Sequence, residues 1–180
     1  VDLDLSGTTF FKANLRNANF NGANLEGVDF RSSDLTGASF NNANLNNAIF
    51  SFAKLDGIDI SQESFSNIGL SKTDLRNVDI SNLDISNRNL SHTNLSNQNL
   101  KNHDLSDTNL NGTDLSHTIL PNDLSGYDFM YTKFYGTDLT GRNFLESNLS
   151  YSVFDNADFT GAKFQVTKAV DSDFSKAKSL

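Results

Sequence analysis

The spacing of the large apolar residues constrains the fold of this chain more than any other feature. From Leu5 to Leu120 every fifth residue is Leu, Phe or Ile, which gives 24 consecutive matches. One residue is missing at Pro121, and the spacing then continues through nine more residues, from Leu124 to Phe164. An α-helix repeats its faces every ~3.6 residues and a flat strand every ~2 residues, so neither fits a period of five. The spacing therefore predicts a solenoid, in which one short unit repeats and stacks on its neighbours.

The residues around each apolar position, here called position i, also follow a rule. The residue before it (i−1) is Asp or Asn in 23 of the 33 units, and the residue two before it (i−2) is commonly Ala. Position i+2 is often Gly or Asn, as in Ala13-Asn14-Leu15-Arg16-Asn17. Gly and Asn tolerate the backbone of a tight turn, and Asp and Asn side chains bind nearby backbone amides. These preferences predict a corner in every unit.

The unit A-[N/D]-[L/F]-x-[G/N] resembles the pentapeptide-repeat family, and the resemblance covers residues from about 3 to 164. It implies an all-β fold: a right-handed quadrilateral β-helix solenoid with four pentapeptides per coil and with positions i and i−2 pointing inward. About nine coils at a spacing of ~4.8 Å would be expected. We expect a single domain over 1–180, with a break one residue short at 121–123 and a degenerate C-terminal coil at 165–180.

Departures from the repeat give further expectations. Of the 15 Phe residues, Phe11 and Phe52 are the two that fall outside position i, so both should point outward. Pro121 predicts a tightened corner, because proline lacks an amide proton and fixes φ. The break is either a tolerated deletion without a role or a slight bend between two stacked subdomains. Near the C-terminus, Val170 is expected to take over the inward position from Ala169.

Composition limits the classes of function. The chain has no Cys, which excludes disulfides and thiolate chemistry, and its net charge of −8 argues against direct nucleic-acid binding. The sequence shows neither a membrane-spanning apolar run nor a signal peptide, so we expect no membrane contact. Because the chain begins with Val in mid-repeat, we expect a processed chain or a segment of a larger bacterial protein, in the cytoplasm or secreted as an effector.

Catalytic patterns are absent from the sequence. The three histidines, His92, His103 and His117, do not have the spacing of a metal site, and the abundant Ser residues occupy position i+1 by rule. No nucleophile-elbow, phosphate-loop or dinucleotide-binding motif occurs. We therefore predict a protein that is not an enzyme and that has no catalytic residues, metal or cofactor.

The strongest candidate for binding is a group of outward apolar residues in positions that elsewhere hold Ser, Gly, Asn or Asp. These are Met130, Tyr131, Tyr135, Tyr151 and Val153. Tyr131 and Tyr151 are twenty residues apart, so they should stack on adjacent coils of one face. Such a cluster resembles the core of a protein interface, although the aromatics alternatively pair only to stabilise the coils. The first hypothesis is a non-catalytic protein–protein interaction module or scaffold whose partner is another protein.

Columns of acidic residues support a second hypothesis. Counting by twenties places Asp84, Asp104 and Asp123 on one face and Asp59 and Asp79 on another. The gyrase-binding members of the family mimic DNA in rod shape and negative charge, so the resemblance offers a type II topoisomerase as partner and an end-to-end homodimer as the assembly. The chain departs from those members because it has no long loop and no clear C-terminal dimerisation helix. A structural spacer without a specific partner is a third interpretation.

One column of polar residues replaces the small residue at i−2. His103, Asn122 and Arg142 should lie on successive coils. The column is either a polar binding stripe or a solvated corner, because such groups are costly to bury without partners.

Overall fold

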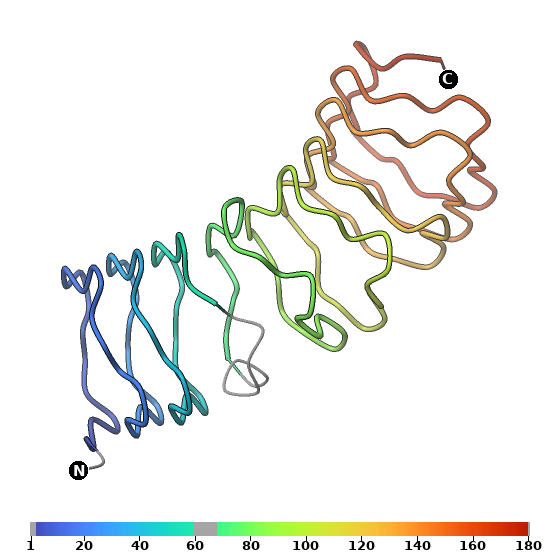
Figure 1. Ribbon diagram of the computed structural model, residues 1–180. Coiled ribbons are helices and arrows are strands. Elements are labelled where there is room, and N and C mark those ends of the chain that lie inside the picture. Colours follow the sequence, from blue (N-terminus) through green and yellow to red (C-terminus); the bar gives the residue numbers. More distant parts are fainter. Residues whose placement is uncertain (1–2, 60–67, 180) are drawn as a thin grey trace. The chain divides into compact units, whose positions relative to one another are not determined.

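The computed structural model describes residues 3–59 and 68–179, in which the chain winds into successive coils (Figure 1). The predicted inward residues Ile60 and Phe65 lie outside these ranges. The described residues contain no helix and no extended strand, and pair instead through single-residue parallel bridges. The chain divides into two compact units, Val1–Asp84 and Ile85–Leu180.

The register of the bridges shows how many repeats make one coil. In the first unit one row runs Asn14↔Asp34↔Lys54↔Asp74, and in the second unit Asn89 pairs with Asn109. Each of these pairs joins residues 20 apart, which is four pentapeptides. Position i−1 of one coil therefore lies beside position i−1 of the next, as the family resemblance implied.

Most of the described corners are turns closed by a short backbone hydrogen bond. The amide of Thr8 donates to the carbonyl oxygen of Leu5 at 3.0 Å, and the same contact recurs along the chain. The residue at i+2 commonly has a φ of 52–73°, which explains the preference for Gly and Asn at that position. The side chain at i−1 closes the corner from outside, since Asp4 Oδ1 accepts a hydrogen bond from the amide of Ser6 at 3.0 Å.

Stacked apolar side chains fill the interior. Leu25, Leu35 and Phe50 have no exposed surface in the first unit. Phe30 stacks on Phe50 with ring centroids 5.0 Å apart, and in the second unit Phe134 stacks on Phe154 at 5.1 Å. Each such side chain contributes about 1.5–3 kcal/mol on burial, so these columns supply the main stabilisation.

A second interior feature, which the sequence did not predict, is a set of hydroxyl groups at position i−2. In the second unit the hydroxyl of Thr118 donates to the carbonyl oxygen of Leu95 at 3.0 Å. The hydroxyl of Thr137 donates to Leu115 O at 2.9 Å, and that of Ser152 to Phe129 O at 2.6 Å. These bonds join a small side chain in one coil to a corner carbonyl of the previous coil.

The missing residue at Pro121 changes the register once, within the second unit. Asp114 pairs with Lys133, 19 residues away, whereas beyond the break Asp123 again pairs with a residue 20 away, Asn143. Asn122 is not among the residues with positive φ, so this corner lacks the left-handed residue of most others. The chain divides into compact units at Asp84–Ile85. This division does not fall at Pro121, where the sequence allowed either a bend between subdomains or a tolerated deletion.

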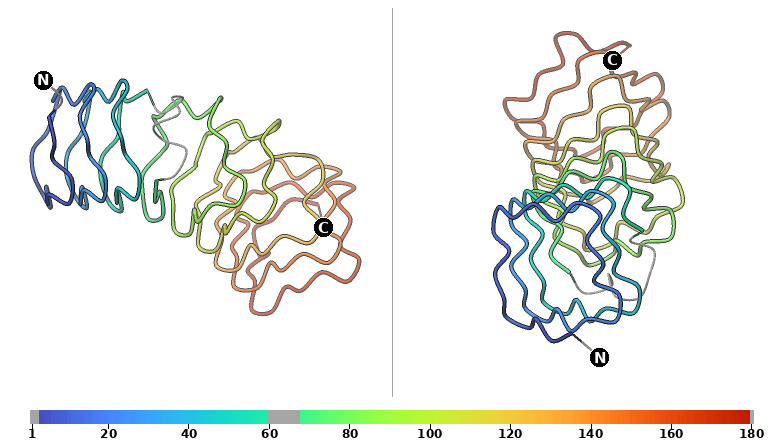
Figure 2. Two further views of the ribbon diagram at one scale, coloured as in Figure 1. Left: turned by 90° about the horizontal axis from the view of Figure 1, so that it is seen from below. Right: turned by 60° about the vertical axis from the view of Figure 1, so that its left-hand side comes forward.

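Two expectations about individual residues have opposite outcomes. Phe11 and Phe52 do point outward, with 52% and 62% of their surfaces exposed. Val170, however, is 57% exposed and does not replace Ala169 in the inward position. The prediction failed because Lys168 pairs with Asn148 and holds the last coils in the ordinary frame, which leaves Val170 at a corner. Figure 2 shows these coils from two further sides.

Candidate protein-interaction face

The five outward apolar residues of the sequence analysis lie on one face of the second unit, and we call this set the tyrosine face. Val153 belongs to the middle row of the face, where it pairs with Lys133 and Asp173. Met130 and the pair Tyr131 and Tyr151 lie at the corner before this row, and Tyr135 follows Phe134 at the corner after it. The structure thus brings the predicted residues together.

Tyr131 and Tyr151 form a stacked pair on adjacent coils. Their ring centroids are 4.9 Å apart and their planes differ by 11°, which confirms the predicted stacking. The two side chains are still 55% and 41% exposed. Their φ angles are 60° and 62°, a conformation that is uncommon for bulky residues and costs roughly 1–2 kcal/mol. The fold therefore holds two aromatic rings at corners where Gly or Asn would be less strained.

The remaining members widen the apolar surface. Tyr135 is 38% exposed, whereas Met130 and Val153 are half-buried. The amide of Met130 donates to Asp128 Oδ1 at 3.2 Å, so this corner keeps the ordinary backbone contact in spite of its unusual side chain. Aromatic rings lie at both corners of the face, and the middle row between them contains Val153 together with the charged residues Lys133 and Asp173.

Ion pairs lie within this face and at one of its corners. Lys133 Nζ lies 3.8 Å from Asp114 Oδ2, and Lys176 Nζ lies 2.9 Å from Asp155 Oδ2. All four residues belong to the same face or to its corners. The face therefore combines exposed aromatic side chains with charged groups, a mixture that protein interfaces also contain.

Two histidines lie at the corners of the same face, which the sequence analysis did not recognise. The ring of His92 covers Gly112 of the next coil, and the ring of His117 covers Gly136. The sequence feature that could have predicted these contacts is the spacing, since a His at i+2 is followed one coil later by a Gly at i+2 in both cases. No group of three His, Cys, Asp or Glu side chains that could hold a metal occurs in residues 3–59 and 68–179.

The predicted acidic columns are only partly assembled. In the first unit, the backbone amide of Ser81 lowers the pKa of Asp79, and the nearby charge of Asp59 acts in the opposite direction, so these two carboxylates are neighbours. In the second unit, hydrogen bonds from Ser125 lower the pKa of Asp123. The row then passes through Asn143 to Lys163, so its acidic character ends there.

The column that was counted as Asp84, Asp104 and Asp123 crosses the division between the units. Asp84 is the last residue of the first unit, and Asp104 belongs to the second. Asp104 and Asp123 both raise the pKa of Tyr127, after the larger effect of burial, which places these two carboxylates near one side chain.

The polar column at i−2 contains one direct contact. Arg142 Nη1 donates to Asn122 Oδ1 at 2.8 Å, and both residues lie in the second unit. Arg142 and His103 are half-buried rather than turned fully into solvent. The column is therefore a partly internal polar contact and not the fully solvated corner that the sequence also allowed.

The interior side of the last described coils contains a cavity of about 260 Å³ lined by Phe164, Thr167, Ala169 and Phe174. Its walls are mainly apolar, because Phe164 and Phe174 occupy inward positions of the repeat. Across the part of the chain that the structure describes, no helical segment has the length and apolar character of a membrane span.

Comparison with known families matches the chain to the Pentapeptide repeats in 8 copies, over residues 1–27, 23–62, 89–122, 128–165 and 143–178. These segments cover more than half of the chain. The chain belongs to the pentapeptide-repeat family, and this membership carries the right-handed β-helix fold that the resemblance implied. None of the curated proteins compared with the chain matches it significantly.

Several solved structures of pentapeptide-repeat proteins are similar to the chain. One, from the Arabidopsis thaliana thylakoid lumen, is 28% identical with a TM-score of 0.34, over 64% of this chain and 67% of that protein. HetL, involved in heterocyst differentiation regulation in the cyanobacterium Nostoc sp., is 22% identical with a TM-score of 0.42, over 98% and 90%. Full-length QnrB1, a plasmid-mediated fluoroquinolone resistance protein, is 18% identical with a TM-score of 0.38, over 96% and 91%.

Proposed function

We propose that this chain is a non-catalytic β-helical module of about nine coils that binds another protein through the tyrosine face. The observation that carries the proposal is the stacked pair of Tyr131 and Tyr151, exposed at corners with positive φ. Two adjacent bulky residues in a strained conformation on the surface are not needed to close the coil, because Gly112 closes the same corner one coil earlier. Strained exposed residues gather where a protein makes functional contacts.

The chemistry of the tyrosine face supports this proposal further. Tyrosine combines a large apolar ring with a hydroxyl group, and it is enriched among the residues that contribute most to protein binding. The ion pairs Lys133–Asp114 and Lys176–Asp155 supply charged groups beside the tyrosine rings. A partner that combines apolar side chains with mixed charges would match this arrangement.

The test is to replace Tyr131, Tyr135 and Tyr151 together by Ser. We expect the variant to lose capture of its partner protein in a pull-down from cells that contain it, while the circular dichroism spectrum stays unchanged. The spectrum should stay unchanged because the rings lie outside the interior columns.

A control replaces two exposed apolar residues that lie off the tyrosine face, Ile119 and Val166, by Ser. They are 50% and 72% exposed, compared with 38–55% for the three tyrosines. This control should retain partner capture. If the tyrosine variant captures the same proteins as the parent chain, the tyrosine face has no binding role and the spacer interpretation gains support.

A second candidate function is that of a DNA mimic that binds a type II topoisomerase such as gyrase as an end-to-end homodimer. It is supported by the net charge of −8 and by the neighbouring carboxylates of Asp59 and Asp79. The apolar cavity formed by Phe164, Phe174 and their neighbours would then lie at the dimer contact. A gyrase supercoiling assay distinguishes the two candidates, because an interaction module of the first kind has no effect on supercoiling.

A further inference from the structure

All the basic residues of the first unit lie on one side of it. Residues 1–84 contain six Lys and Arg, and we call this set the basic side: Lys12, Arg16, Arg31, Lys54, Lys72 and Arg76. When the chain is counted in blocks of twenty, all six fall within places 11–16 of their block. Because the bridges pair residues 20 apart, this clustering in sequence is a clustering in space.

The backbone contacts place the six residues on one row and its two corners. Lys54 belongs to the row that begins at Asn14. At one corner the amide of Lys12 donates to Arg31 O at 3.0 Å, and two coils further on that of Phe52 donates to Lys72 O at 2.9 Å. Arg16 and Arg76 lie at the opposite corner, directly after the inward residues of that row.

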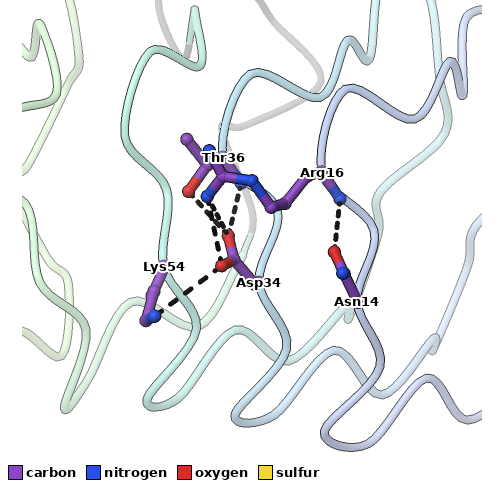
Figure 3. A network of polar contacts seen from close by, with 5 residues as sticks. All are labelled: Asn14, Arg16, Asp34, Thr36 and Lys54. Atoms are coloured by element: carbon purple, nitrogen blue, oxygen red, sulfur yellow. Dashed lines mark hydrogen bonds and ion pairs between the residues drawn. The ribbon is translucent and has the colours of Figure 1, made fainter.

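Ion pairs order this surface without neutralising it (Figure 3). Asp34 Oδ2 lies 3.2 Å from Arg16 Nη1 and 3.7 Å from Lys54 Nζ, so one carboxylate is shared by two cations. The side chains of Arg16 and Lys54 remain 51% and 68% exposed. Arg31 pairs with Asp29 at 2.8 Å, and Arg76 pairs with Asp74 at 2.6 Å. Even when Asp56 at the corner is counted, the basic side has more basic than acidic side chains, although the chain as a whole is acidic.

Two exposed aromatic rings lie on the same side. Phe11 has Lys12 Nζ 5.1 Å and Arg31 Cζ 5.8 Å from its ring centroid, and Phe52 has Lys72 Nζ at 5.8 Å. The two rings lie at one corner, two coils apart, with Arg31 on the coil between them. Exposed Phe and Arg residues together are typical of the centre of a protein interface.

The mixture of charges indicates the class of partner. Binding to nucleic-acid phosphates depends on Lys and Arg charges, and Asp34, Asp56 and Asp74 within this surface reduce the net charge available for it. Opposite charges interspersed around apolar side chains are instead complementary to a protein surface. We propose that the basic side binds a net acidic surface of a partner protein whose apolar side chains contact Phe11 and Phe52. This surface is separate from the tyrosine face and does not depend on it.

The test measures binding of a fluorescent synthetic peptide of repeated Glu-Glu-Phe triplets to the full chain by anisotropy. We expect binding that weakens as salt rises, because exposed charges are screened beyond a Debye length. The double variant Lys12→Glu/Lys72→Glu should weaken it by about tenfold or more. Phe11→Ser/Phe52→Ser should weaken it as well, with a smaller dependence on salt. Circular dichroism verifies that each variant is folded.

The matched control makes the same change of charge in the second unit, with Lys163→Glu/Lys168→Glu, and should bind the peptide like the parent chain. The proposal is overturned if the peptide does not bind, or if both charge-reversed variants weaken binding equally. It is also overturned if a fluorescent oligodeoxythymidine binds the chain more tightly than the peptide does, because that result assigns the surface to nucleic acid.

Discussion

At the scale of single residues, the corners of the coil are decided by which side chains tolerate positive φ. Gly112 has a φ of 70°, and a Cβ added to it would overlap the ring of His92. Gly141 has a φ of 65° but nothing near its Cβ position. These two glycines separate the cost of the backbone conformation from the cost of the side-chain overlap.

We predict that Gly112→Ala destabilises the chain more than Gly141→Ala does. Both variants carry the cost of a left-handed non-glycine residue, roughly 1–2 kcal/mol, but only Gly112→Ala must also displace the imidazole. Urea denaturation followed by circular dichroism measures the free energies of unfolding.

Adding His92→Ala to Gly112→Ala should recover the additional stability that Gly112→Ala loses relative to Gly141→Ala, because it removes the overlapping ring. Equal destabilisation by the two single variants, with no recovery in the double variant, would show that the His92 ring does not restrict this corner.

The preference for Gly and Asn at these corners could be predicted from residue type alone. The strained Tyr131 and Tyr151 could not, because their conformation follows from their place in the repeat and not from their own preference. Their exposure could be predicted, since inward positions were already assigned to other residues.

At the scale of the coil, buried hydroxyl groups tie each turn to the previous one. Thr137 is 1% exposed, and its hydroxyl donates to Leu115 O. Thr160 carries the same side chain at the surface, where its hydroxyl reaches Asp158 Oδ1 at 2.7 Å. Water can replace the partner of Thr160 but not that of Thr137.

We predict that Thr137→Val lowers the free energy of unfolding by about 1 kcal/mol, the usual net value of a buried hydrogen bond. The shape of the side chain is nearly conserved, so the loss reflects the hydrogen bond. Thr160→Val should have a smaller effect in the same urea titration. If Thr160→Val lowers the free energy of unfolding as much as Thr137→Val does, burial of the hydroxyl does not determine the effect.

The sequence indicated small residues at i−2 but not the bonds that they make. These bonds could not be predicted from the repeat, because the acceptor lies in another coil, 23 residues away for Thr118 and 22 for Thr137. A local sequence pattern contains no information about that carbonyl until the register of the coils is known.

At the scale of the whole molecule, the repeated carboxylates at i−1 make stability depend on acid. The Thr36 hydroxyl donates to Asp34 and, with its amide and Arg16, lowers the pKa of that carboxyl to about 2. Contacts from Ser125 and Thr160 lower the pKa of Asp123 and Asp158 in the same way. A folded-state pKa below the unfolded value means that the stabilisation is complete above the unfolded value and is lost as pH falls.

We predict that the urea midpoint changes little between about pH 7 and pH 5 and falls between about pH 4 and pH 2, as these carboxylates take up protons. Asp34→Asn should reduce this acid dependence, because the amide keeps an acceptor oxygen without titrating. A midpoint that rises as pH falls through this range would contradict the assignment.

The architecture was predictable because one property, the five-residue spacing, extends over nearly the whole chain. The arrangement of residues on the surface was less predictable. Basic residues are spread evenly along the sequence, and their gathering from Lys12 to Arg76 on one side emerges only when positions are compared at intervals of twenty. The division at Asp84–Ile85 has no counterpart in the repeat, and nothing in the structure explains its position.

The twenty-residue register has a consequence for how such a chain can evolve. Gain or loss of a whole coil within a unit leaves every later side chain on its original face of the β-helix. Gain or loss of one pentapeptide instead moves every later side chain to the adjacent face. Either change preserves the interior, since the same apolar residue types occupy the inward positions of all four faces. Only gain or loss of a whole coil preserves a surface such as the one that contains Lys12 and Lys72. Selection for binding would therefore favour changes in chain length that are multiples of twenty residues.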